Sequence, residues 1–450
     1  MRVEQPYIDL FQQHGELLCR HSSPVLNAQR AKAFQAFQQQ GFPTRKLERY
    51  KYTDISKLFE PDFGMNLRRV EVQTNPYEVF RGSVPQLSTS PYFVVNDAYY
   101  PPSAPHRELP AGVLVGSLRQ LSEQYPDLVG TYYGKIAQVQ TDGITAFNTA
   151  FAQDGLLIYV PRGVVMEHPL QLINLMRSER DLLACRRVLI IVEAGAQLTL
   201  LACDHALSGA QTLATQVIEA YVGNDARLDF YELEETASSH TRIGQLYVQQ
   251  EAGSQVLLGS MTLMGGVTRN TTSVRMVGQG ATLQAYGMAI EDGRQVMDNQ
   301  VYVEHAAPRC TSDQLFKYVL DDAAVGAFAG LVKVQPGAHH TESHQTNRNL
   351  CATREAHMYT QPQLEIYNDD VQCSHGATVG QLDEAALFYM RQRGISLHEA
   401  RLLLMFAFVD DVVSAVRIPT LRDRLRQLVE LRFRGELGKG CAACNICKKV

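Results

Sequence analysis

Residues 188–202 read VLIIVEAGAQLTLLA, two short apolar stretches joined by a turn at Gly195. A glycine followed by a small or turn-forming residue opens further stretches of this kind, and the successive intervals are 28, 30, 27 and 57 residues. A repeat of this length is typical of a solenoid, in which each unit buries its apolar face only by stacking on its neighbours. The repeated pairs are Gly195-Ala196, Gly223-Asn224, Gly253-Ser254, Gly280-Ala281 and Gly337-Ala338.

The segments between these turns have the pattern of β-strands. From about residue 140, apolar and polar residues alternate in short stretches, and helical periodicity is nearly absent. A β-sandwich is the rival fold, but its turns would recur about every 8–12 residues without the longer repeat. We predict a mainly β protein whose core, residues 136–382, is a parallel β-helix. The strand-like stretches are 156–160, 188–194, 197–202, 227–233, 255–261, 282–288 and 331–336.

Helical signals dominate the beginning of the chain. Residues 1 to about 60 are predicted to be mostly helical, within an N-terminal region of residues 1–135. Ser23 precedes a proline in a capping arrangement, and Gly41 ends the same helix. Residues 74–112 are rich in Pro, Ser and Tyr and are predicted to be irregular.

Residues 383–450 form the third predicted region, three helices followed by a cysteine-rich tail. The middle of the second helix, residues 402–409, is apolar around most of its circumference, so several neighbours must cover it. The capping signals of the three helices are Asp383, Ser396 with Glu399, and Thr420 with Asp423.

The composition excludes several classes of protein. Apolar residues make up 45% and charged residues 20% of the 450 residues, which fits a soluble globular chain. The net charge of −5 removes the usual argument for nucleic-acid binding, which needs a concentrated positive field. The longest dense apolar run is far below the roughly 20 residues that cross a bilayer, and the first residues lack the apolar stretch of a signal peptide. We therefore expect a cytoplasmic protein that binds neither nucleic acid nor membranes.

The nine cysteines are an odd number, which favours free thiols over a disulfide framework. Cys373 and His375 are two residues apart near the end of the β-rich region, so an extended strand would project both side chains to the same side. Such a pair can accept sulfur or ligate a soft metal. The plainer interpretation from the chemistry alone is a buried cysteine beside a hydrogen-bonded histidine.

Other polar groups give weaker signals. Asp369 and Asp370 could be a general acid and base of a β-helical carbohydrate-active enzyme, but adjacent strand residues point to opposite faces. His339, His340 and His344 suggest a metal site, although strand residues four apart lie about 13 Å from one another. We expect a turn or cap role for the aspartates, and the histidines would need a loop to share a metal ion.

The chain ends in GKGCAACNICKKV, which contains a C-x2-C-x2-C spacing found in zinc and iron–sulfur sites. Only three thiols are present, so a fourth ligand would have to come from elsewhere. The tail therefore allows either an ancillary metal site or exposed redox-sensitive thiols. The three cysteines are Cys441, Cys444 and Cys447.

Residues 298–416 resemble the SufB/SufD family of the Suf iron–sulfur cluster assembly machinery, and they resemble SufD more than SufB. The strongest match is PQLEIYNDDVQCSHGATVGQLDEAALFYMRQRGIS, which begins at Pro362. Upstream, PTRKLERYKYTDI resembles the N-terminal motif of the family, although a tryptophan usually stands in the place of Tyr50. The other matching segments are VEHAAP, SDQLFKYVL, FAG, VQPGA and TESHQTNRNL.

This resemblance implies a right-handed parallel β-helix flanked by helical regions. It also implies a non-enzymatic scaffold that pairs with SufB and binds the ATPase SufC through its C-terminal helices, with ATP bound on SufC. The interface cysteine and histidine of the family fall on Cys373 and His375, where a transient iron–sulfur cluster would form. Without SufB, the only pairing expected of the chain is with a second copy of itself, as a homodimer. The alternatives are a carbohydrate-active enzyme and a stand-alone metal-binding protein.

Overall fold

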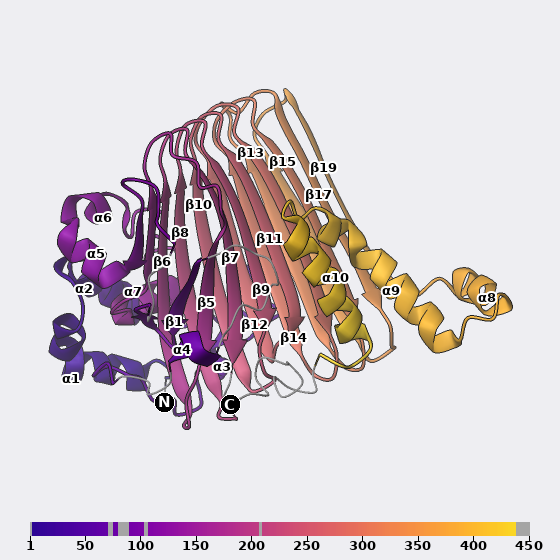
Figure 1. Cartoon of the computed structure of the whole chain (residues 1–450), viewed down its shortest axis with the longest axis horizontal. Helices are drawn as coiled ribbons and strands as arrows, with labels where there is room; N and C mark the ends of the chain where they lie inside the picture. Colours follow the sequence, from indigo (N-terminus) through magenta and orange to yellow (C-terminus); the bar gives the residue numbers. More distant parts are fainter. Residues whose placement is uncertain (1, 71–74, 80–89, 103–106, 207–208, 438–450) are drawn as a thin grey trace.

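The computed structural model describes residues 2–70, 75–79, 90–102, 107–206 and 209–437. Its core is a parallel β-helix made of two facing sheets, which confirms the predicted fold class (Figure 1). The chain alternates between the sheets, so odd-numbered strands from β5 to β19 lie in one and even-numbered strands from β4 to β18 in the other. The strands are β1 Ser90–Val95, β2 Ala98–Tyr100, β3 Leu114–Ser117, β4 Leu156–Val160, β5 Leu170–Met176, β6 Leu182–Val192, β7 Gln197–Ala206, β8 Thr212–Val222, β9 Arg227–Glu235, β10 His240–Gln250, β11 Gln255–Met264, β12 Val267–Met276, β13 Thr282–Glu291, β14 Val296–His305, β15 Thr311–Leu320, β16 Val325–Val334, β17 Thr341–Cys351, β18 His357–Ile366 and β19 Val371–Gly380.

The turns of successive coils are stacked on one another through a residue with a left-handed backbone. This residue recurs at intervals of 27 to 32 positions, and its N–H donates to a carbonyl of the next coil. Gly195, Gly253 and Gly280 are in this position, as predicted. In the turns of Gly223 and Gly337, however, the left-handed residues are Asp225 and His340. The full series is Gly163, Gly195, Asp225, Gly253, Gly280, Arg309 and His340.

Arg309 accounts for the interval of 57 residues, which is two coils long. Its φ is 57°, and its N–H donates to the carbonyl of His339 in the turn that follows. The repeat therefore continues there without a glycine.

Apolar side chains from both sheets fill most of the space between them. Val188 and Ile190 of β6 and Leu198 and Leu200 of β7 belong to one continuous core that reaches Phe328 of β16. Because strand side chains alternate, the remaining positions of each strand face outward, and helices at the two ends of the chain cover part of these outer faces.

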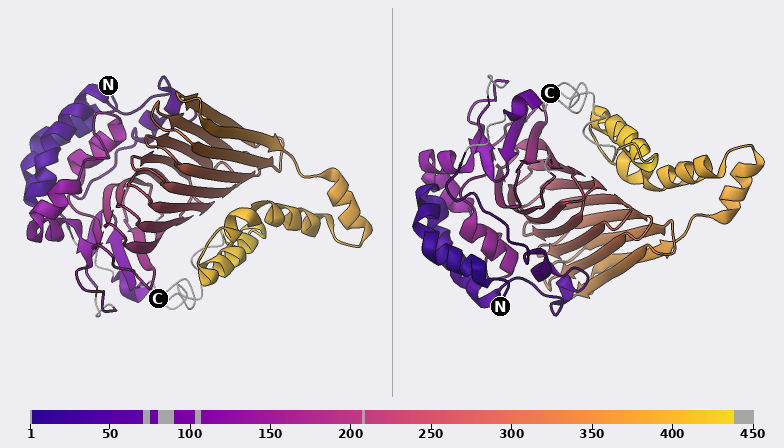
Figure 2. Two further views of the ribbon diagram at one scale, coloured as in Figure 1. Left: turned by 90° about the horizontal axis from the view of Figure 1, so that it is seen from above. Right: turned by 90° about the horizontal axis from the view of Figure 1, so that it is seen from below.

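The N-terminal helices gather at one end of the strand stack (Figure 2). Ser23 caps α2 by accepting a hydrogen bond from the N–H of Leu26, and Gly41 ends it with φ 65°, as predicted. Helix α7 is buried along its whole length and packs against α2, β6 and β8. The helices of this region are α1 Gln5–Arg20, α2 Pro24–Gln40, the 3-10 helix η1 Glu48–Tyr50, α3 Ile55–Leu58, α4 Pro76–Val79, α5 Leu118–Gln124, α6 Pro126–Tyr132 and α7 Gly143–Phe151.

The segment predicted to be irregular contributes two strands to the odd-numbered sheet. Strand β1 pairs in parallel with β5, and β2 pairs with β1. Strand β3 lies just after this segment and pairs with β4. In the segment PTRKLERYKYTDI, residues 44–49 are exposed, but Tyr50 is packed. Tyr50 is buried, its hydroxyl donates to Asp142, and the Arg269 guanidinium lies 4.0 Å above its ring.

Three helices follow the β-helix, as predicted: α8 Glu384–Gln392, α9 Leu397–Ser414 and α10 Pro419–Phe433. Asp383 and Ser396 cap α8 and α9 by accepting backbone N–H groups. Glu399 does not complete a capping box, because its carboxylate pairs with Arg434 at 3.0 Å. The third helix begins at Pro419 without a side-chain cap, so the cap predicted at Thr420 is wrong.

Helices α9 and α10 pack on the solvent face of the odd-numbered sheet, against β15, β13 and β11. Val409, Val412, Leu425 and Leu428 are buried in this contact. Helix α8 stands away from the strand stack (Figure 1, Figure 2). No helix among the described residues has the length and apolar character needed to cross a bilayer.

Candidate functional site at the open end of the β-helix

Cys373 and His375 lie on β19, the last strand of the odd-numbered sheet. In the described part of the chain, the outer edge of β19 has no strand partner, and neither has the outer edge of β18 in the facing sheet. Cys373 is half-buried and His375 is exposed. The sequence prediction that an extended strand carries both residues is therefore confirmed.

The register of β19 defines the side to which the two residues point. Cys373 pairs with Ser343 and His375 with Gln345, and both partners are buried between the sheets. Since residues in register on parallel strands share a face, Cys373 and His375 are directed toward the interior, above the last complete row of side chains. The two side chains thus belong to the same side of the same open coil.

Cys373 is the better shielded of the two groups. Its side chain packs beside Val332, Val334 and Ala338. Burial raises the pKa of the Cys373 thiol, and the backbone N–H of Ser343 opposes that shift. The thiol therefore favours its neutral form until a metal or another cation compensates the thiolate charge.

Two rows of neutral polar side chains continue below this pair. In the first row, Ser343 and Ser312 share a hydrogen bond of 2.8 Å, and Ser312 is 2.9 Å from Nε2 of His305. In the second row, Gln345 donates to Oε1 of Gln314 at 3.0 Å. All five side chains are buried, so hydrogen-bonded polar side chains that are shielded from solvent lie directly below the site.

The turn role predicted for the two aspartates fits the structure, and the three histidines lie in a turn or on the outer surface. His340 and Asp370 form an exposed ion-pair contact of 3.0 Å between neighbouring turns, and the amide of Asn368 lies 3.2 Å from Nδ1 of His339. His344 is on the outward face of β17 and hydrogen-bonds Ser374 at 2.8 Å.

No group of three or more His, Cys, Asp or Glu side chains in the described ranges is arranged to hold a metal ion. Cys441, Cys444 and Cys447 lie outside the described residues. Of the six cysteines that the structure describes, only Cys19 and Cys373 are not buried. Cys19 is on α1, in the helical region that precedes the β-helix.

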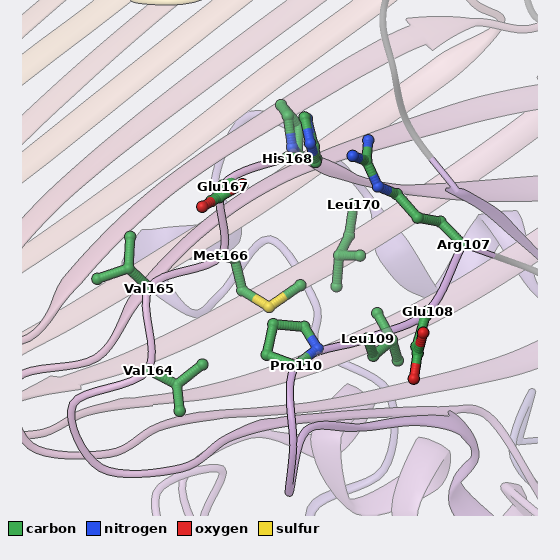
Figure 3. A pocket seen from close by; sticks show the side chains of 11 residues that line it. Arg107, Glu108, Leu109, Pro110, Val164, Val165, Met166, Glu167, His168 and Leu170 are labelled. Atoms are coloured by element: carbon green, nitrogen blue, oxygen red, sulfur yellow. The ribbon is translucent and has the colours of Figure 1, made fainter.

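Two pockets lie away from this site. One, of about 590 Å³, is formed by residues 107–110 and 164–170 near the first coil, with Arg107 and His168 among its polar groups (Figure 3). The other, of about 760 Å³, lies on the outward face of the even-numbered sheet between η1 and residues 135–141. Sequence reasoning gave no signal for either pocket, and neither contains a predicted site residue.

Exposed apolar side chains accompany the open end and the C-terminal helices. Tyr359 and Ile366 of β18, Tyr367 after it and Val379 of β19 are exposed next to the free strand edges. Further along the chain, Phe388 and Tyr389 of α8 and Leu397 and Leu403 of α9 are also exposed. Exposed apolar residues that gather near unpaired strand edges are typical of an interface with another protein.

Comparison with known proteins places most of the chain in one family. The family model of the SUF system FeS cluster assembly, SufBD core domain, matches residues 175–408, and that of the SufBD protein N-terminal region matches residues 1–172. The chain is 29% identical over 401 residues to the iron-sulfur cluster assembly protein SufD of Escherichia coli, covering 88% of this chain and 90% of that protein.

Two further relatives extend the comparison. The chain is 28% identical over 402 residues to an iron-sulfur cluster assembly SufBD family protein of Synechocystis, with 87% of both chains covered. It is 27% identical over 410 residues to protein ABCI7, chloroplastic, of Arabidopsis thaliana, covering 86% of this chain and 82% of that protein. With more than half of its length matched by the core model, the chain belongs to the SufBD family of iron–sulfur cluster assembly proteins.

Proposed function

We propose that this chain is a SufD-type scaffold subunit without catalytic activity of its own. In this proposal it pairs with a SufB-like protein through the open end of the β-helix and binds a SufC-like ATPase through its C-terminal helices. A transient iron–sulfur cluster, which is the cargo of the complex, forms beside Cys373 and His375. The observation that carries the proposal is a thiol and an imidazole side by side at an uncovered edge.

The uncovered edge favours a protein partner. Unpaired N–H and C=O groups of β18 and β19 can continue their sheets into another chain, and natural proteins seldom leave such edges bare. A partner that covered this end would also bury Tyr367 and Val379. The same edge would let the isolated chain pair with a second copy of itself.

The chemistry of the pair favours an iron-containing cargo. Thiolate and neutral imidazole are both good ligands for iron, and their common side lets both approach one point. A cluster held between two subunits needs only one or two ligands from each. His375 is exposed, whereas Cys373 is half-buried and must lose a proton from a thiol whose pKa is raised by burial.

The exposed face of the C-terminal helices favours a second partner. Phe388, with 64% of its surface exposed, and Tyr389, with 57%, project from α8, which stands away from the strand stack. Helices α9 and α10 cover apolar strand residues. Deleting them would expose a large hydrophobic face and destabilise the β-helix itself. Point substitutions on α8 are therefore the sharper test of ATPase binding.

Three further elements of the proposal are independent of the β-helix. ATP is bound and hydrolysed by the SufC-like partner, and the three tail cysteines form an ancillary metal site. The proposed compartment is the cytoplasm, and a relative in Arabidopsis is named as chloroplastic. None of these elements is needed for pairing at the open end.

Anaerobic reconstitution of the three-component complex tests the proposed site. We expect His375→Ala and Cys373→Ala to lower the yield of cluster, followed by its absorption spectrum and iron content, by about tenfold or more, with His375 the more sensitive. His14→Ala and Cys19→Ala are matched controls, because they remove an exposed imidazole and an exposed thiol of α1, in the helical region that precedes the β-helix.

Thermal stability and co-purification of the same variants distinguish a ligand role from a packing role. We expect both properties to be unchanged in His375→Ala and Cys373→Ala. A destabilised variant whose surviving complex makes cluster normally would contradict the assignment. Normal cluster yield in a stable His375→Ala complex would contradict it as well.

For the second partner, we expect Phe388→Ala with Tyr389→Ala to weaken binding of the ATPase in a pull-down without changing pairing at the open end. Undiminished ATPase binding by this double variant would contradict the proposed role of α8.

A further inference from the structure

We propose that Gln345 positions His375 by accepting a hydrogen bond from one ring N–H, which leaves the other ring nitrogen free to bind iron. The iron-binding role of His375 rests on the proposed function, but the hydrogen bond between Gln345 and His375 concerns this chain alone. It makes Gln345 a positioning residue, since it acts on iron only through His375.

Gln345 is held rigidly below His375. Its residue is 1% exposed, and its Nε2 donates to Oε1 of Gln314 in the coil below at 3.0 Å. On the facing sheet, a Cβ added to Gly330 would collide with the amide of Gln345. The amide therefore occupies a slot that exists only because residue 330 is a glycine.

The oxygen of this amide has no hydrogen-bond partner. Oε1 of Gln345 is fully buried and unpartnered among the described residues. Leaving such an acceptor unsatisfied costs free energy, so a donor is required near it. Gln345 donates to Gln314, and its own Oε1 accepts from no described group, His375 included. The proposed hydrogen bond therefore forms when the exposed imidazole of His375 turns toward this oxygen.

His375 is the residue in the coil above. It pairs in register with Gln345, and neighbouring residues in register lie about 4.8 Å apart with side chains on one face. A neutral imidazole has one donor and one acceptor nitrogen, and a histidine that binds a metal normally donates its other N–H to a carbonyl or carboxylate. The amide oxygen of Gln345 fits that role and would fix both the tautomer and the ring plane.

The test uses the isolated full chain without iron, labelled with ¹⁵N-histidine. Long-range ¹H–¹⁵N spectra at a pH where the imidazoles are neutral report the tautomer of each ring. The signals of His375 are assigned among the 13 histidines by their loss in His375→Ala. We expect a single tautomer in the parent chain, and the mixture found for a free imidazole would overturn the proposal without any further variant.

Two substitutions then remove the acceptor in independent ways. Gln345→Met keeps the length of the side chain but deletes the carbonyl, and Gly330→Ala displaces the amide from its slot. We expect both to convert His375 to a mixture of tautomers. The control His14→Ala removes an exposed imidazole of α1 and should leave His375 unchanged.

The outcomes separate this inference from the proposed function. A single unchanged tautomer in folded Gln345→Met would end the role of Gln345, whatever happens to cluster assembly. Normal cluster yield in His375→Ala would end the ligand role of His375, even if Gln345 fixes its tautomer. If both proposals hold, Gln345→Met should lower cluster yield about tenfold while pairing of the subunits persists.

Discussion

The interior of the β-helix differs between its two halves. Toward the N-terminal coils it contains charged groups: Arg186 contacts Asp204 at 2.6 Å across the two sheets, and Arg242 contacts Glu232 at 2.6 Å. Toward the open end the interior polar groups are the neutral rows of serine and amide side chains, such as Ser343 and Gln345. Buried charged side chains are therefore found in the coils near the N-terminal helices, and the interior polar side chains near the open end are neutral.

This difference has a physical reason. Buried ions are tolerated only in a closed and fully paired environment, because an unpaired charge in the interior is very costly. Neutral amides and hydroxyls tolerate a change of neighbours, such as the arrival or departure of a partner and its cargo. The comparison thus separates a structural half, the charged N-terminal coils, from a working end, the open end at β18 and β19. Four experiments test whether the two regions differ in this way.

The largest effect is expected in the charged half. Asp204→Ala would leave Arg186 and Arg242 without their shared carboxylate, and we expect a loss of about 3–5 kcal/mol in the free energy of unfolding. Asn349→Ala, which removes a buried neutral amide near the open end, should cost only about 1–2 kcal/mol. Urea denaturation of both variants measures the contrast, and equal losses would contradict it.

A pH dependence should come from the charged half as well. Burial raises the pKa of Glu234 from 4.5 to about 7, although Arg242 opposes the shift. The folded state therefore holds this proton more tightly than the unfolded state, and the stability it contributes is complete below pH 4.5 and is lost as the pH rises through about 7.

Replacing Glu234 by glutamine removes this dependence. Between pH 5 and pH 8, we expect the parent chain to lose on the order of 1–3 kcal/mol relative to Glu234→Gln. Urea denaturation at the two pH values checks the sign. A parent chain that gains stability relative to the variant as the pH rises would show that Glu234 is ionised in the fold.

The working end should respond in binding rather than in stability. Val379 is 51% exposed on β19, and Val165 is 48% exposed on the segment that precedes β5. We expect Val379→Lys to weaken pairing with the SufB-like partner about tenfold, and Val165→Lys to leave it unchanged, with little effect of either on the melting temperature. Weakened pairing in both variants would mean that the open end is not the specific interface.

The smallest effect is expected at the exposed turns. His340 and Asp370 approach to 3.0 Å, but both side chains are more than half exposed. Exposed ion pairs contribute little, so Asp370→Asn should change the free energy of unfolding by less than about 0.5 kcal/mol. A larger loss in urea denaturation would show that the turn contacts hold the last coil in place.

Much of the fold could be predicted because the signals were local. Turn glycines recur with the coil, and Asp383 and Ser396 mark two helix starts by capping chemistry. Strands such as β12 and β17 were missed, since many of their residues are polar on both faces and lack alternation. Arg309 could not be anticipated as a turn residue, because nothing local distinguishes an arginine that adopts a left-handed backbone.

The candidate site was predictable only in part. Strand alternation alone placed Cys373 and His375 on one side, and the register confirmed it. Their surroundings were not predictable, because Gln345 lies 30 residues earlier and meets His375 only through stacking of coils. Once the coil length is known, a polar residue one repeat before a candidate ligand is the signal to look for.

The path of the chain after β19 has a mechanical consequence. The chain leaves the last strand, runs out to α8, and returns so that α9 rests on β15 and β13. A load applied to α8 therefore enters the strand stack at two points, the end of β19 and the docking site of α9. Strand β19 is the first of these two points and has a strand partner on one side only, so tension on the arm would be felt first by the strand that carries Cys373 and His375.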